Sequence, residues 1–321
     1  MANAREIQNR IKSIKDTMKI TKAMYMMSSM KLRKARQKRE DTAPFFYGLQ
    51  EQITSILCHF PDMQHLYFDN REKDKREKIK KKGYIVVTGD KGMAGAYNHN
   101  VIKEAVKQVE NADDLHMYVV GEVGRHYFRS QGYPLDESFL FSANNPSIHR
   151  ARVITERIVD LYKREELDEV YIVYTRMINS MREEVTFEQL LPLKTHEFIK
   201  QEMIKSAGVG MYADGELEHA DDWFLIYPSP KRVLERIVYN YITGYMYGAL
   251  VESSASEENC RMIAMQAATN NAESMLRELS IQYNRIRQAA ITQEITEVIG
   301  GAKALRKKKK KKAMALSAMQ K

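Results

Sequence analysis

The chain has 321 residues, a formal net charge of +9, an isoelectric point of about 9.2 and a mean hydropathy of −0.51. This balance favours an acidic partner, such as nucleic acid, an anionic membrane or an acidic protein surface. Cys58 and Cys260 match no metal-ligand or redox spacing, and neither a signal-peptide core nor a stretch of about 18 apolar residues is present, so we expect a cytosolic protein without membrane insertion.

Residues 1–58 are predicted to form one long helix. Apolar residues recur at steps of four and three, close to the 3.5-residue period of a coiled coil, at Ile7, Ile11, Ile14, Met18, Thr21 and Met24, with Met27 just beyond. We expect Pro44 to kink this helix and not to end it. The reason is that the pattern continues through Leu49, Ile53, Ile56 and Leu57.

The middle of the chain has a different character. Residues 59–83 contain a run of lysines, arginines and acids and are predicted to be a solvated linker. Residues 84–222 are predicted to be an α/β domain with a largely parallel sheet. Its expected strands are 84–88, 116–121 and 169–175, separated by helices near 98–110, 122–131 and 148–165. Further extended segments are expected at 185–193 and 223–228, with a mobile loop at 205–221.

Residues 223–305 are predicted to be the C-terminal shaft segment, whose long helix begins at Pro230. Two apolar series follow the same rhythm, one being Leu276, Leu279, Tyr283, Ile286 and Ala290, the other Ile291, Ile295, Val298, Ala302 and Leu305. A helix from Pro230 to Leu305 would be roughly 110 Å long, which exceeds the diameter of a globular domain of this size. Both long helices must therefore project beyond the domain, and antiparallel pairing buries both stripes. Residues 306–321 are predicted to be a disordered, Lys-rich tail.

The stretch GDKGMAGAYN, residues 89–98, is the first candidate for chemistry because it follows a strand and precedes a helix. Gly89, Gly92 and Gly95 do not have the G-x-G-x-x-G spacing of a dinucleotide site, and no P-loop lysine follows. We therefore interpret Gly89, Lys91, Gly92 and Gly95 as a docking turn.

No catalytic constellation or metal-ligand spacing is found, so we expect no catalytic residue, no metal and no cofactor. The basic cluster of the first helix remains open between a solvated face, a contact with DNA and a contact with an acidic protein surface. It comprises Lys31, Arg33, Lys34, Arg36, Lys38 and Arg39.

These segments resemble one family, the gamma subunit of the rotary F-type ATP synthase. Its C-terminal signature I-T-x-E-x-x-[DE]-x-x-x-G-A is matched by ITQEITEVIGGA, residues 291–302. REIQNRIKSIKDTMKITKAM (5–24), TGDKGMAGAYN (88–98) and YPSPKRVLERI (227–237) are similar to the family's opening helix, its first strand and turn, and its entry into the last helix.

The resemblance implies an antiparallel coiled coil of the terminal helices and a small Rossmann-like α/β domain. It implies a non-catalytic rotor stalk that couples H⁺ or Na⁺ flow through a membrane ring to the conformations of the catalytic beta subunits. The implied partners are the alpha and beta subunits of an α3β3 hexamer, the epsilon subunit and the membrane c-ring, at the cytoplasmic face of the cell membrane and without nucleic acid.

The resemblance also implies particular contact residues. Lys22 and Met24 match the segment that faces an acidic loop of beta, and Arg261 and Gln288 match positions that contact a catch loop of beta. Thr292, Glu294 and Glu297 fall in the signature. The tail departs from the family pattern, which usually ends shortly after GGAKAL. The resemblance implies that this end points into an apolar bearing at the top of the hexamer, which seven consecutive cations from Arg306 to Lys312 suit poorly. A nucleotide-dependent enzyme and a nucleic-acid binder remain the alternative classes.

Overall fold

The computed structural model describes residues 2–60, 63, 65–68, 81–110, 114–179, 182–195, 198 and 226–318. It contains two compact units. The central unit is Met26–Ala264, and the terminal unit joins Met1–Tyr25 to Met265–Lys321. Most of the expected charged linker and the expected loop at 205–221 lie outside the described residues.

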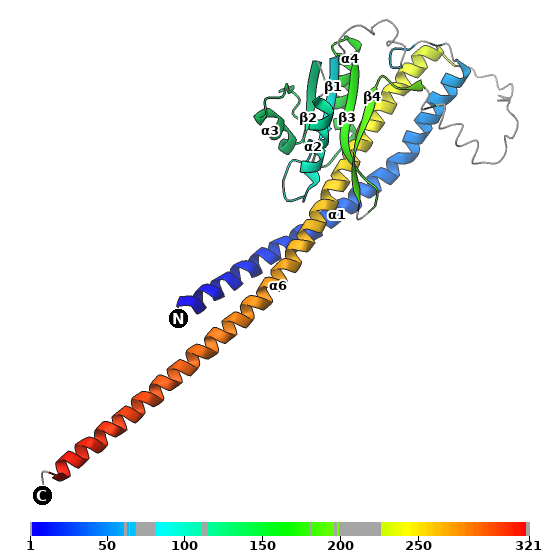
Figure 1. Ribbon diagram of the computed structural model, residues 1–321. Helices are drawn as coiled ribbons and strands as arrows, with labels where there is room; N and C mark the ends of the chain where they lie inside the picture. The colour runs from blue at the N-terminus through cyan, green and yellow to red at the C-terminus, as the bar shows by residue number, and fades with distance from the viewer. Residues whose placement is uncertain are drawn as a thin grey trace. The chain divides into compact units, whose positions relative to one another are not determined.

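Four strands form one sheet with the order β2-β1-β3-β4, which Figure 1 shows from end to end. The strands are β1 (Lys81–Val87), β2 (Asp114–Val120), β3 (Glu169–Met177) and β4 (Glu183–Leu191). β1 pairs in parallel with β2 and β3, whereas β4 pairs antiparallel with β3. The predicted parallel sheet is therefore present, and the segment expected to be extended at 185–193 becomes its antiparallel edge.

Alternation along β1 explains how both faces of the sheet are covered. Tyr84 and Val86 pack with α2 (Tyr97–Val109) and α3 (Glu122–Ser130), whereas Ile85 and Val87 join the larger core with α4 (Ile148–Lys163) and the long helices. Successive side chains of a strand point to opposite faces, so a run of four buried residues requires a layer on each side.

The long helices are α1 (Ala2–His59) and α6 (Pro230–Ala318). α1 continues through Pro44, and the apolar residues expected after it are buried or half-buried. In the central unit, ascending positions of α1 meet descending positions of α6: Lys31 with Glu258, Arg39 with Glu252 and Phe46 with Tyr241. The two helices are therefore antiparallel, as the stripes predict. We expected disorder from residue 306, but α6 continues through the cationic run to Ala318, because lysine is a good helix former.

Gly121 is where the α3 end of β2 approaches the end of β1. It has φ +93°, and a Cβ built there would lie 2.3 Å from the Thr88 carbonyl oxygen. The Thr88 hydroxyl occupies the same junction, where it donates to the Val120 carbonyl at 2.9 Å and accepts from the Gly124 N–H at 3.0 Å. Only glycine fits between these groups.

Gly121→Ala is expected to lower the free energy of unfolding by about 3 kcal/mol or more, since it adds a steric clash to the cost of a positive φ. Gly132→Ala is the matched control, because Gly132 has φ +77° but open space around its Cβ. It should cost only about 1–2 kcal/mol. Urea denaturation of the full-length chain measures both, and equal losses would contradict the steric argument.

Candidate functional site

The backbone of the turn between β1 and α2 is held by hydrogen bonds within the chain. The Gly89 N–H donates to Asn98 Oδ1 at 2.8 Å, and the Gly89 carbonyl accepts from the Val123 N–H at 3.1 Å. Lys91 is exposed, and its carbonyl accepts from the Asn98 side-chain amide at 3.4 Å. Gly95 has φ +56°, as expected of a tight turn. The backbone groups of Gly89 are thus engaged within the chain.

Asp90 fastens the same turn to residues 142–144. Its carboxylate accepts from the Ser142 hydroxyl at 2.5 Å and from the Ala143 and Asn144 N–H groups at 3.2 and 3.0 Å. A further N–H, that of Glu122, lies at 3.3 Å. Burial alone raises the pKa of this carboxyl, but these hydrogen bonds outweigh burial and hold the pKa below its ordinary value. Asp90 is therefore an ionised structural group.

On the other side of the turn, α6 presents a buried charge cluster. Arg261 forms ion pairs with Glu257 and with Glu258, the latter at 3.0 Å, and donates to the Gly92 carbonyl at 3.5 Å. All three charged side chains are at most 10% exposed. Lys31 of α1 adds a second cation to Glu258 at 2.9 Å. The Arg261 guanidinium thus links the turn to α6.

The two carboxyls of this cluster differ. Burial raises the pKa of Glu257. Burial acts the same way on Glu258, but hydrogen bonds from Lys31 and Ser28 and the charge of Arg261 outweigh it and lower the pKa. A Cβ built on Gly89 would lie 2.8 Å from Glu257 Oε1. A carboxylate against the first glycine is the wrong charge for a phosphate site, so the geometry disfavours phosphate binding at this turn.

The basic cluster of α1 is partly used inside the central unit. Lys31 and Arg39 pair with Glu258 and Glu252, and Lys38 donates to the Pro146 carbonyl at 2.8 Å. Arg33 and Lys34 are exposed. A DNA-binding helix needs its cations free for phosphates, so this engagement disfavours the contact with DNA as the role of the basic cluster.

In the terminal unit, the predicted stripe of α1 is the half-buried face. All six predicted members from Ile7 to Met24 are half-buried, whereas Met27, in the central unit, is 55% exposed. Thr21 Oγ1 lies 2.8 Å from Thr269 Oγ1, and Lys22 pairs with Glu273 at 3.1 Å. The period-3.5 interpretation is confirmed for this segment.

The α6 stripe changes its environment near Ala290. Its first series, from Leu276 to Ala290, is half-buried, but every member of the second series is exposed, with Ile295 at 54% and Val298 at 71%. Equal rise per residue in antiparallel helices places Ala2 roughly level with Gln288 when Thr21 faces Thr269. The cover that α1 provides ends there, so the remaining stripe is unpartnered among the described residues.

The implied contact residues fall into different surroundings. Lys22, Gln288, Thr292, Glu294 and Glu297 are exposed on the terminal unit, and Met24 is half-buried in the stripe. Arg261 is buried at 8% exposure in the central unit, where it serves the charge cluster. Sequence reasoning missed Asp90, Glu257 and Glu258. The available signal was the acidic pair at 257–258 in an otherwise small and apolar helical stretch, one turn before Arg261.

Within the described ranges, no group of three or more His, Cys, Asp or Glu side chains is placed to hold a metal ion. The described helices also include none with the length and apolar character needed to cross a lipid bilayer.

Arg261→Met is expected to lower the free energy of unfolding by about 3–5 kcal/mol near pH 8, because two buried carboxylates lose their shared cation. The variant raises both folded-state pKa values, and a raised carboxyl pKa means stability that is lost as pH rises through it. The loss should therefore be smaller at pH 5 than at pH 8. Urea denaturation at both pH values measures it.

Arg164→Met is the matched control, because Arg164 forms an exposed pair with Asp160 at 2.7 Å. Its effect should stay within about 0.5 kcal/mol at either pH. A pH-independent loss for Arg261→Met would contradict the electrostatic role of the cluster.

Comparison with known proteins places these features in a family. A family model described as ATP synthase matches residues 3–305. The chain is 43% identical over 304 residues to an ATP synthase gamma chain of Ruminiclostridium cellulolyticum, covering 94% of this chain and 99% of that one. It is 36% identical over 304 residues to a gamma chain of Acetobacterium woodii that is named sodium ion specific, covering 94% and 99%.

Solved structures share the fold. A chain in the Euglena gracilis mitochondrial ATP synthase structure of OSCP, F1 and c-ring has a TM-score of 0.60 at 19% identity, covering 95% of each chain. A chain in the Tetrahymena thermophila central stalk and c-ring structure has a TM-score of 0.53 at 21% identity, covering 78% of this chain and 99% of that one. With the matches at the sequence level, these findings establish that the chain belongs to the ATP synthase gamma chain family.

Proposed function

We propose that this chain is the central rotor stalk of an F-type ATP synthase. In this role it transmits the torque of a membrane ring, driven by H⁺ or Na⁺, to the catalytic beta subunits. The observation that carries the proposal is the uncovered apolar stripe of α6 from Ile291 to Leu305. A row of exposed Ile, Val and Leu side chains on a polar helix is a surface for a protein partner.

The proposed mechanism is differential contact. Each beta subunit exists in several conformations, and a stalk shifts their populations only where its contacts with those conformations differ in free energy. We assign the terminal unit to this task, with Lys22, Met24, Gln288, Thr292, Glu294 and Glu297 as contacts to beta. Arg261 can contact beta only with the small exposed part of its side chain, because its guanidinium is paired with Glu257 and Glu258.

The chain supplies no catalytic group in this proposal. The charged side chains that are most buried at the turn, Glu257, Glu258 and Arg261, compensate one another and hold the fold together. Nucleotides then belong to the surrounding hexamer of alpha and beta subunits. The docking turn around Lys91 faces protein, either the acidic lower loops of beta or the epsilon subunit, and the assembly lies at the cytoplasmic face of the cell membrane on the c-ring.

Co-purification tests the proposal directly. Co-expressed with the alpha and beta subunits of its own enzyme, the chain should elute as part of a stable complex, and a DNA fragment should not compete for it. A chain that stays apart from alpha and beta, or that binds DNA with a steep salt dependence, would overturn the assignment.

Val298→Asp is expected to reduce assembly with alpha and beta at least tenfold, because contact at the stripe then requires burial of a carboxylate. The variant should leave the chain's own free energy of unfolding within about 0.5 kcal/mol of the parent, since Val298 is 71% exposed. Quantitative co-purification and urea denaturation separate the two effects.

Ala304→Asp is the matched control. Ala304 is exposed on the same helix but lies about 140° around the axis from the middle of the stripe, given about 100° per residue. Its assembly yield should match that of the parent chain. Equal yields for Val298→Asp and the parent would argue against the stripe as the contact surface.

Truncation after Leu305 is expected to leave assembly and coupled ATP synthesis unchanged. The family match ends at residue 305, and the cations that follow suit an apolar bearing poorly. Proton-driven or sodium-driven ATP synthesis in inverted vesicles is the measurement, and a loss of coupling would give the tail a function of its own.

A further inference from the structure

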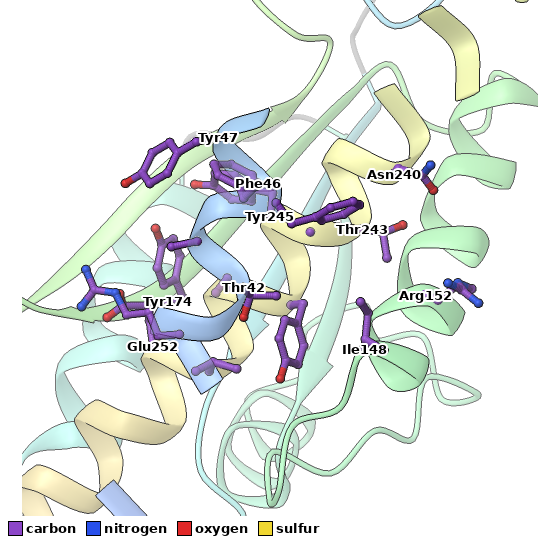
Figure 2. Close-up of a pocket in the computed structure, with 18 of the residues that line it drawn as sticks. Thr42, Phe46, Tyr47, Ile148, Arg152, Tyr174, Asn240, Thr243, Tyr245 and Glu252 are labelled. Atoms are coloured by element: carbon purple, nitrogen blue, oxygen red, sulfur yellow. The ribbon is translucent and has the colours of Figure 1, made fainter. Parts of the chain in front are cut away.

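A cavity of about 550 Å³ lies inside the central unit between α1, α4, β3 and α6. Figure 2 shows Ile148 and Arg152 of α4 on one side and Tyr174 and Glu252 on the other. Phe46 of α1 and Tyr245 of α6 lie between them. Its size falls within the roughly 300–1,000 Å³ that small-molecule sites occupy. None of these residues belongs to the charge cluster or to the stripe.

The walls of the cavity present apolar surface although they contain hydroxyls. Thr42 donates to the Lys38 carbonyl, and Thr243 donates to the Tyr239 carbonyl at 2.9 Å, each within its own helix. The Tyr245 hydroxyl is bonded to Glu188. Phe46 is fixed by a stacked contact with Tyr241, at 4.9 Å between ring centroids. The hydroxyls of Thr42, Thr243 and Tyr245 are therefore already engaged within the chain, and a guest can pack against the ring of Phe46.

The charge lining the cavity is positive. Arg39, Arg152 and Arg176 come from three different elements, against the single carboxylate of Glu252. Glu252 is already compensated, because Arg39 Nε lies 2.8 Å from it and the Met177 N–H donates to it at 3.3 Å. Arg152 is exposed and has no ion pair within the described part of the chain. An anion entering here meets uncompensated guanidinium charge.

We propose that this cavity binds a small aromatic anion, with one planar apolar body and a single carboxylate, sulfonate or phosphate head. The body stacks against Phe46 and Tyr245, and the head lies near Arg152. Such a ligand bridges α1, α4 and α6, so it stabilises the central unit by a free energy that rises with the logarithm of ligand concentration above the dissociation constant. This site is independent of the stalk function and needs no partner subunit.

The test uses two fluorescent probes on the full-length chain. 8-Anilinonaphthalene-1-sulfonate has the proposed chemistry, and N-phenyl-1-naphthylamine is its uncharged counterpart. The parent chain should bind the sulfonate at one saturable site, more tightly than the neutral probe, and its melting temperature should rise with sulfonate concentration. Added salt should weaken binding of the sulfonate and leave binding of the neutral probe unchanged.

Gly248→Leu fills the cavity. Gly248 lines it, and a Cβ built there has no neighbour within 4 Å, so the larger side chain enters open space. This variant should weaken both probes at least tenfold. Gly300→Leu is the matched control, since Gly300 lies in the same helix with equally open space and is outside the lining. It should bind both probes as the parent does.

Arg152→Gln separates charge from shape. It should weaken the sulfonate roughly fivefold and leave the neutral probe unchanged, as expected for a partly exposed charge. Arg164→Gln, on the exposed Asp160 pair at the end of α4, should change neither. Binding that survives Gly248→Leu, or that responds equally to both arginine variants, would overturn the proposal. The proposal would also be overturned if the Gly248→Leu variant lost assembly with alpha and beta but still bound the probes. That result would assign the cavity to a protein segment.

Discussion

The central unit depends on the ion pairs that the buried guanidinium of Arg261 forms. This guanidinium compensates Glu257 and Glu258, and through the Gly92 carbonyl it reaches the turn that ends β1. Removing Arg261 leaves two buried carboxylates without their shared cation, which costs more than the ion pairs gain, so the three side chains form one electrostatic group. Lys31 extends this group to α1. One ionic cluster therefore joins the sheet and both long helices.

The same cluster makes the glycine turn of this architecture a poor place for a phosphate. A parallel sheet with a glycine turn at the end of its first strand normally leaves backbone N–H groups open for a phosphate. In this chain Asn98 accepts from the Gly89 N–H, and Glu257 lies against the Cβ direction of Gly89. Asp90, which accepts from the Ser142 hydroxyl and three backbone N–H groups, adds a further negative charge. The Gly89 N–H and the Asp90 carboxylate are thus engaged within the chain itself.

The spacing of apolar residues predicted the buried faces of the two long helices well, because residues three and four positions apart lie on the same face of a helix. The steps from Ile7 to Met24 and from Leu276 to Ala290 name the half-buried faces, and Pro44 stays inside α1 as expected. What spacing does not encode is the partner of each charge. Arg261 was expected at a surface, yet it is buried, because its neutralisation depends on Glu257 and Glu258 one turn away and on a carbonyl 169 positions earlier. The end of cover near Ala290 also depends on the register of the two helices, which the contacts of Thr21 with Thr269 and of Lys22 with Glu273 reveal.

That register gives the stalk its asymmetry. Where α1 and α6 pair, each apolar stripe faces the other helix, and the outer surface is largely polar. Beyond Ala290, α6 continues without a partner among the described residues, apolar along Ile291 to Leu305 and polar on the opposite face with Gln293, Thr296 and Lys303. A surface with equal affinity for every conformation of a partner shifts no population, however strongly it binds. A helix with two unlike faces meets surrounding subunits unequally at any one angle. Its rotation therefore changes which of them is favoured, and this unequal contact is the physical requirement for a shaft that drives conformational change.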